Sequence, residues 1–183
     1  MPAAPAVERV VERAVLVCGT RGTLAHGDGR PVRGTCVDTV RSMDVTPTDL
    51  LGTWRLEREV EDRLAGDRRT VTGTTVLEPV EPGRVRWHEE GVMRWSGHEV
   101  PVQRTLWVVR EDAGWAVRFE DGRPFHPWAV GEPVEHPCGP DHYTGLIEAV
   151  PVDATAPAFW RVEWRARGPQ KDYVMLTVLR RAD

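Results

Sequence analysis

The chain has 183 residues, of which 40% are hydrophobic and 28% charged, a balance typical of one soluble globular domain. Its formal net charge of -4 at pH 7 gives no global signal for a nucleic acid or an anionic membrane as partner. The 17 glycines and 15 prolines predict many turns and argue against a helical bundle.

The first segment, residues 1–47, differs from the rest of the chain. Charged residues interrupt the apolar runs near its start, so it lacks the pattern of a secretory signal, and the apolar stretch Ala14–Cys18 is far too short to span a bilayer. Glycines mixed with charged residues over Gly19–Gly34 predict a flexible loop. We therefore expect a cytoplasmic protein with a flexible extension, residues 1–47, and one folded domain, residues 48–183.

The cysteines agree with this expected location. Cys18, Cys36 and Cys138 are odd in number and widely separated in the sequence. This pattern fits reduced thiols better than a disulfide framework.

From Asp49 onward, short runs of alternating apolar and polar residues predict antiparallel strands with one buried face. Turn residues separate several of these runs, at Glu81–Gly83, Ser96–Glu99, Glu111–Gly114 and Gly168–Lys171. We predict about nine strands, over Trp54–Val60, Thr70–Leu77, Arg84–Glu89, Val92–Trp95, Val102–Arg110, Trp115–Glu120, Tyr143–Val150, Phe159–Arg167 and Tyr173–Arg181.

Strands joined by hairpin-length links predict an all-β, antiparallel up-and-down barrel of about 8–10 strands, because closure protects the edges of such a sheet. A barrel of this size is filled by side chains or holds one small ligand. Alternating strand residues predict an apolar lining that includes Trp87, Trp107, Trp160 and Trp164.

Gly52-Thr53-Trp54 near the start of this domain and Arg180-Arg181 at its end resemble the Gly-x-Trp and terminal-Arg signature of calycins, the lipocalin superfamily. In calycins the tryptophan closes the barrel floor and the arginine packs across its ring. Longer motifs resemble the uncharacterised family named domain of unknown function 6314, over roughly Leu50–Arg181. They are Leu51-Gly52-x-Trp54-x-Leu56-x-Arg58, His88-Glu89-Glu90-Gly91, Phe119–His126, His136–Tyr143, Trp160-x-x-x-Trp164 and Gly168–Tyr173.

This resemblance implies a calycin-like β-barrel with a shared polar site of unassigned purpose, and it implies no activity. The family usually reads Gly-Pro-Arg-Lys-Asp-Tyr in the last hairpin. Here Gln170 replaces the arginine, so a charge-based role at that position is in doubt.

Chemically versatile residues gather in two segments, Asp121–Tyr143 and Gly168–Tyr173. These segments contain both tyrosines, the only lysine and three of the six histidines. Glycines and prolines predict that they lie on loops or strand ends, which a closed meander can bring together at one barrel mouth. The candidate ligand-binding residues are Arg123, His126, His136, Asp141, Tyr143, Lys171 and Tyr173.

Two readings exist for the basic members of this set. In one reading, the planar guanidinium of Arg123 binds a carboxylate or phosphate of the ligand. In the other, Arg123 holds its loop in place through a salt bridge to Asp121 or Asp141. Lys171 anchors an anion, becomes nucleophilic if desolvated, or pairs with the neighbouring Asp172.

The other members also have two readings. His126 and His136 serve as hydrogen-bonding or acid–base groups near neutral pH, or they bond only to the backbone. Tyr143 and Tyr173 donate their hydroxyl groups to a ligand, or they pack in the sheet.

Metal and carboxylate chemistry are less well supported. His136-Pro137-Cys138, with His142 and His126, lacks the paired spacing of a zinc site, so we assign no metal. Haem binding through one of these histidines, as in the nitrobindin branch of calycins, follows by fold analogy only, and the cofactor is unknown. Adjacent carboxylates on a strand point to opposite faces, so the two members of Glu89–Glu90 or of Glu120–Asp121 cannot both enter one site. We expect these carboxylates on solvated faces.

Three functions fit these observations. The first is a binding barrel whose mouth recognises a small ligand with a polar or anionic head group. The second is a small hydrolase, isomerase or cyclase with His126 or His136 as base and Lys171 or Tyr173 as stabiliser. The third is a protein-interaction module that presents the charged strand face Arg161, Glu163, Arg165 and Arg167. Neither ligand identity nor oligomeric state follows from the sequence.

Overall fold

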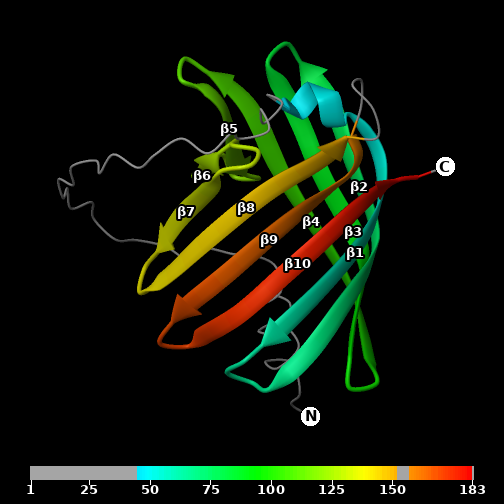
Figure 1. Ribbon diagram of the computed structural model, residues 1–183, viewed down its shortest axis with the longest axis vertical. Helices are drawn as coiled ribbons and strands as arrows, with labels where there is room; N and C mark the ends of the chain where they lie inside the picture. The colour runs from blue at the N-terminus through cyan, green and yellow to red at the C-terminus, as the bar shows by residue number, and fades with distance from the viewer. Residues whose placement is uncertain (1–44, 152–156, 183) are drawn as a thin grey trace, which may run out of the picture.

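The computed structural model describes residues 45–151 and 157–182, so the predicted extension lies outside it except for its last three residues. Ten antiparallel strands form one sheet that curls into a nearly closed barrel (Figure 1). This confirms the predicted all-β fold of about 8–10 strands. No helix among the described residues is long and apolar enough to cross a membrane.

The sheet has the strand order β6-β5-β4-β3-β2-β1-β10-β9-β8-β7. Its elements are the 3-10 helix η1 (Pro47–Leu50) and the strands β1 (Gly52–Asp62), β2 (Asp67–Glu81), β3 (Arg84–Trp95), β4 (His98–Glu111), β5 (Gly114–Phe119), β6 (Pro124–Pro127), β7 (Pro133–Cys138), β8 (Asp141–Pro151), β9 (Pro157–Gly168) and β10 (Lys171–Arg181).

The strand boundaries depart from the prediction in two places. The runs Arg84–Glu89 and Val92–Trp95 form one strand, β3, because the backbone stays extended through Glu90 and Gly91. The short strands β6 and β7 were not predicted at all. Each begins with a proline and contains a second one, a composition that is typical of edge strands and turns rather than of sheet centres.

The opening of the barrel lies between β6 and β7, which are consecutive in the chain. The first and last strands close the sheet instead, since β1 and β10 pair from Trp54 opposite Arg181 to Asp62 opposite Tyr173. Among the described strands, no ladder of backbone hydrogen bonds joins β6 to β7. Prolines have no N–H to donate, so both edges are poorly suited to pairing. We call this opening the β6–β7 seam.

Tryptophans fill the barrel near η1. The rings of Trp54, Trp87 and Trp128 each lie 5.2–6.4 Å from the ring of Trp160. Trp107, which we expected in the lining, lies on the outer face beside Arg84, whose guanidinium carbon is 4.1 Å from the centre of the indole ring. The prediction failed because both faces of this strand are apolar, and Leu106 and Val108 are the buried residues.

Trp54 and Arg181 form the contact implied by the resemblance to calycins. The indole of Trp54 donates a 2.8 Å hydrogen bond to the Leu50 carbonyl, and the guanidinium carbon of Arg181 lies 4.1 Å from the centre of the Trp54 ring. Gly52 has φ +118°, and a Cβ there would lie 2.7 Å from Arg181 Nη1. The glycine of the Gly-x-Trp motif is therefore required by its backbone conformation, and an added Cβ would also force the Arg181 guanidinium to shift.

We predict that Gly52→Ala lowers the free energy of unfolding by about 2–3 kcal/mol, because it adds both backbone strain and a clash with Arg181. Gly114→Ala is the matched control, since Gly114 has a similar positive φ, +129°, but no atom within 4 Å of the added Cβ. Urea unfolding of both variants measures the difference. Equal losses would mean that the close approach of Arg181 has no energetic effect.

Candidate functional site

Charged side chains occupy inward-facing positions in the middle of the barrel. Glu89 on β3 accepts hydrogen bonds from two arginines, at 2.7 Å from Arg58 Nη2 and at 2.9 Å from Arg104 Nη2. Arg58 on β1 also donates from Nε to the Thr177 hydroxyl at 2.7 Å. We call Arg58, Glu89 and Arg104 the interior charge cluster.

The position of Glu89 corrects the sequence analysis. We expected this carboxylate on a solvated face, but its side chain is 5% exposed. The neighbouring Glu90 is exposed, as the alternation of a strand requires. The inference that adjacent carboxylates face apart was correct, whereas the assumption that both face solvent was wrong.

The interior charge cluster carries one more positive charge than negative charge. Burial alone would raise the pKa of Glu89, but attraction and hydrogen bonds from Arg104 and Arg58 outweigh it and lower this pKa to about 2. Burial lowers the pKa of Arg104, and Glu89 opposes that shift. Arg104 Nε is buried and has no hydrogen-bond partner. The cluster therefore keeps an unused donor and an unbalanced charge.

His126 on β6 and His136 on β7 are both buried and neutral. Their Nδ1 atoms lie 2.8 Å from the Pro127 carbonyl and 2.9 Å from the Phe125 carbonyl. Burial lowers the pKa of His126 to about 4, to which the charge of Arg104 contributes, and burial likewise lowers the pKa of His136. The bond from His136 to Phe125 also spans the β6–β7 seam.

Lys171, Asp141 and Tyr143 form a second polar group at the ends of β8 and β10. Lys171 Nζ lies 2.9 Å from Asp141 Oδ2 and 2.6 Å from the Tyr143 hydroxyl. Burial alone would lower the pKa of Lys171, but these two bonds outweigh it and raise the pKa, so the amine stays charged. Lys171 therefore pairs with Asp141 and not with the predicted neighbour Asp172, and a charged amine is no nucleophile.

Tyr173 connects this second group to the interior. Burial raises the pKa of Tyr173, and a hydrogen bond with Tyr143 adds to the shift, so its hydroxyl stays protonated. Tyr173 also interacts electrostatically with Arg104. The tyrosine pair thus leads from Lys171 towards the interior charge cluster.

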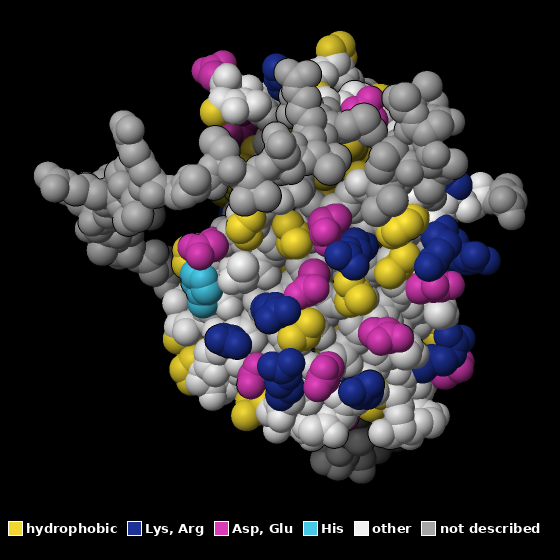
Figure 2. All heavy atoms as spheres, in the orientation of Figure 1, with side chains coloured by type: hydrophobic (Ala, Val, Ile, Leu, Met, Phe, Trp, Pro, Cys, Tyr) yellow, Lys and Arg dark blue, Asp and Glu magenta, His cyan; other side chains and the backbone are white. Residues whose placement is uncertain are grey.

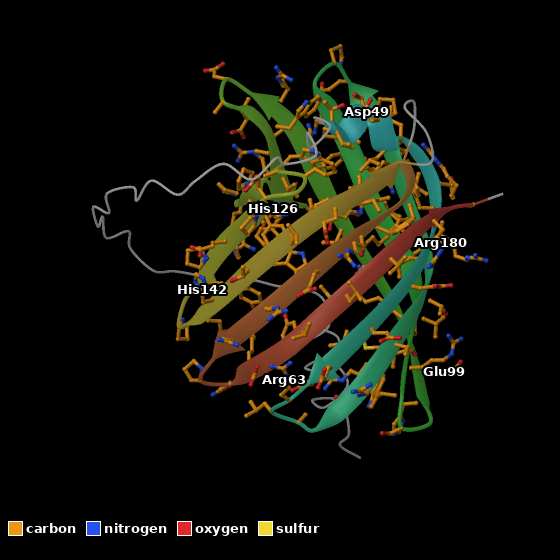
Figure 3. The ribbon with its side chains drawn as sticks, in the orientation of Figure 1. Asp49, Arg63, Glu99, His126, His142 and Arg180 are labelled. Atoms are coloured by element: carbon orange, nitrogen blue, oxygen red, sulfur yellow. The ribbon has the colours of Figure 1, made fainter. Side chains whose placement is uncertain are left out.

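Arg123 lies at the rim in the turn between β5 and β6. Its Nε is 2.7 Å from Asp121 Oδ2, and its backbone N–H donates to Asp121 Oδ1 at 3.1 Å. The loop-pinning salt bridge that we considered is therefore present. His142 is exposed, and its Nε2 lies 3.7 Å from Glu135 Oε1 near the β7–β8 turn. It is separate from His126, which lies on β6 (Figure 3).

Arg104 is the residue around which the predicted segments meet. It interacts electrostatically with His126 from one segment and with Tyr173 from another. The ring centres of His136 and Tyr143 lie 6.0 Å apart, which connects these two site residues as well. The sequence analysis did not identify Arg104. The available signal was its alternation with Leu106 and Val108, but the opposite face of β4, with Trp107, is apolar too, so the pattern does not show which face is buried.

A small cavity adjoins the interior charge cluster. Its volume is about 10 Å³, at the lower limit for one water molecule. Its lining residues are Leu56, Arg58, Val71, Glu89, Glu90, Val102, Gln103 and Arg104. The side chains therefore leave space beside Arg104 for an atom or two, and a larger ligand requires the barrel to open.

Metal ligands and cysteine chemistry do not extend this site. Within residues 45–151 and 157–182, no group of three or more His, Cys, Asp or Glu side chains could hold a metal ion. Cys138 at the end of β7 is disulfide-bonded. The expectation of reduced thiols is therefore wrong for Cys138.

The fold and the site together define a nearly closed antiparallel barrel with a charged, hydrogen-bonded interior. The chain belongs to the family of unknown function DUF6314, whose model matches residues 50–181. This confirms the family resemblance drawn from the motifs. No curated protein matches the sequence.

Several solved barrels are distantly similar. A redesigned β-barrel, mFAP0, bound to DFHBI is 16% identical, with a TM-score of 0.40, and the match covers 73% of this chain and 99% of that one. The S-type phycobiliprotein lyase CPES from Guillardia theta is 11% identical, with a TM-score of 0.42, over 75% of this chain and 90% of that one. Similarity at this level does not say what the present chain binds.

We predict that Glu89→Gln destabilises the protein by about 3–5 kcal/mol, because it leaves two buried guanidiniums without a counter-charge. Glu90→Gln, one residue away on the exposed face, is the control and should change the free energy of unfolding by less than about 0.5 kcal/mol. Denaturant unfolding at pH 7 measures both. Similar small effects would contradict the account of the interior charge cluster.

We also predict that acid destabilises the fold through His126. Its pKa is about 4 in the folded protein against an ordinary value of 6.5 for histidine, so the unfolded chain binds the proton more readily. The stability that neutral His126 contributes is full above pH 6.5 and is lost as the pH falls to 4. His126→Asn should flatten the dependence of unfolding free energy on pH across this window. An unchanged slope would show that another group causes it.

Proposed function

We propose that this protein binds a small ligand inside its barrel and recognises it by an anionic group. The supporting observation is the interior charge cluster, in which two guanidiniums share one carboxylate and Arg104 Nε has no acceptor. An unbalanced buried charge and an unpaired buried donor are both unfavourable. One anionic oxygen beside Arg104 would compensate both, and a guanidinium suits a carboxylate or a phosphate.

The anionic group belongs beside Arg104 and not at the rim. Arg123, the arginine that the sequence suggested, already pairs with Asp121 in its turn. Lys171 is likewise neutralised by Asp141. His126 and His136 add no positive charge at neutral pH, because burial lowers both of their pKa values.

Entry of the ligand takes place through the β6–β7 seam in this proposal. The cavity of about 10 Å³ has no room for the body of an organic molecule, so part of the wall must move. Separating β6 from β7 breaks no backbone ladder between described strands, whereas every other neighbouring pair is hydrogen-bonded. The bond from His136 to Phe125 is the polar contact that such an opening would break.

The two other functions have weaker support. A general base works best with a pKa near the working pH, and a pKa of about 4 makes His126 a weak base. Two of the three arginines on the strand face considered for protein interactions are already paired, Arg161 with Glu148 and Arg165 with Glu163. Basic and acidic side chains alternate over the face seen in Figure 2, so no charge of one sign dominates it.

We predict that benzoate binds to the purified protein, whereas benzyl alcohol binds more weakly and benzylamine does not bind. These probes share an aromatic ring and differ in the charge that meets Arg104. Arg104→Met should weaken benzoate binding about 10- to 100-fold, the effect of losing a hydrogen bond to a charged group. Isothermal titration calorimetry measures each affinity.

Arg110→Met is the matched control. Arg110 lies on the same strand but is exposed, with its guanidinium carbon 5.7 Å from the centre of the Trp115 ring. Arg104→Met leaves Arg58 and Glu89 as a balanced pair, and circular dichroism tests whether the variant remains folded. Equal affinity for the three probes, or benzoate binding that survives Arg104→Met, would overturn the proposal, as would a failure of benzoate to bind.

A further inference from the structure

His136 has a fixed tautomer. Its Nδ1 faces the Phe125 carbonyl at 2.9 Å, and a carbonyl oxygen only accepts hydrogen bonds. The proton of the neutral ring therefore lies on Nδ1. Nε2 consequently carries a lone pair and acts as an acceptor.

This acceptor is buried and unsatisfied. His136 is 8% exposed, and its Nε2 has no hydrogen-bond partner. Leaving a buried acceptor unpaired costs about 1–3 kcal/mol, so such an atom calls for an explanation. Its ring neighbours are Phe119 at 5.6 Å and Phe125 at 5.0 Å, neither of which has a side-chain donor.

Tyr143 does not satisfy His136 either. Its ring centre lies 6.0 Å from that of His136, and no hydrogen bond joins its hydroxyl to Nε2. A metal ion is a poor partner for Nε2, because the charges of Arg123 and Arg104 act on this histidine pair and repel cations. A neutral N–H or O–H donor fits the position better.

We propose that the ligand carries, besides its anionic group, a hydroxyl or N–H donor that His136 Nε2 accepts. The inference rests on the proposed function, since it concerns the same ligand in the same barrel. His126 lies near both recognition points, because it interacts electrostatically with both Arg104 and His136. The class of ligand is therefore a hydroxy- or amino-substituted organic acid, bound by Arg104 at one end and by His136 at the other.

The test compares benzoate with 3- and 4-hydroxybenzoate and with their methoxy analogues, which keep the ring and the charge but cannot donate. We expect one hydroxybenzoate to bind about 2- to 10-fold more tightly than benzoate and than its methoxy analogue, the effect of one neutral hydrogen bond. Isothermal titration calorimetry supplies the affinities.

His136→Asn tests the assignment to Nε2. Asparagine can keep a donor at the position of Nδ1, and with it the bond to Phe125, but it has no atom at the position of Nε2. The hydroxyl preference, measured as the ratio of hydroxybenzoate affinity to benzoate affinity for the same variant, should disappear. His136→Gln, whose amide oxygen can reach the Nε2 position, should restore part of the preference.

The outcomes separate the two proposals. If benzoate binds and neither hydroxyl group improves its affinity, or if the preference survives His136→Asn, the present inference is wrong and the proposed function stands. If benzoate itself does not bind, the proposed function fails and this inference fails with it. If the variants do not fold, the comparison of hydroxyl with methoxy probes on the unaltered protein still decides the question.

Discussion

The carboxylate of Glu89, held between Arg58 and Arg104, is the contact on which the interior of this barrel depends. Without it, two guanidiniums would lie among apolar side chains with no counter-charge, which is among the most costly arrangements in a protein core. With it, three strands, β1, β3 and β4, are tied together across the inside of the sheet. In this arrangement the buried Nε of Arg104 has no hydrogen-bond partner, and this property distinguishes the site from a purely structural ion pair.

The interior is divided between two kinds of packing. Near η1, the tryptophans around Trp160 fill the barrel and have few polar contacts. Farther along the strands, imidazole, phenol, guanidinium and carboxylate groups replace them, and these groups interact with one another through hydrogen bonds, ring contacts and charge. Polar networks of this kind hold their side chains in defined positions when every donor and acceptor is hydrogen-bonded, and they destabilise the folded state when some are not. The unsatisfied atoms Arg104 Nε and His136 Nε2 mark where the network is incomplete.

Much of the fold could be predicted from the sequence, because alternation with period two is a direct record of which face is buried. The strands around Trp54, Trp160 and Leu179 show that alternation clearly, and the turns between them are marked by glycine. The strands β6 and β7 could not be recognised from the sequence, because the two prolines in each are more typical of a loop than of a strand. Of the candidate site, His126, His136, Tyr143, Lys171 and Tyr173 do converge, but Arg104 and Glu89 were missed. A single charged residue inside a strand normally faces water, and only the coordinates show that these two face each other instead.

The pairing of β1 with β10 also bears on how the chain reaches its native state. Contacts such as Arg58 with Thr177 and Arg181 with Leu51 join residues 119 and 130 positions apart. Such distant contacts are slow to form, because a long stretch of chain must be ordered before they contribute. The hairpins can assemble locally, but the wall is completed only when β10 pairs with β1. We therefore expect closure to be the slow event in folding, and a growing chain on the ribosome to expose the apolar face of its sheet until β10 has been synthesised.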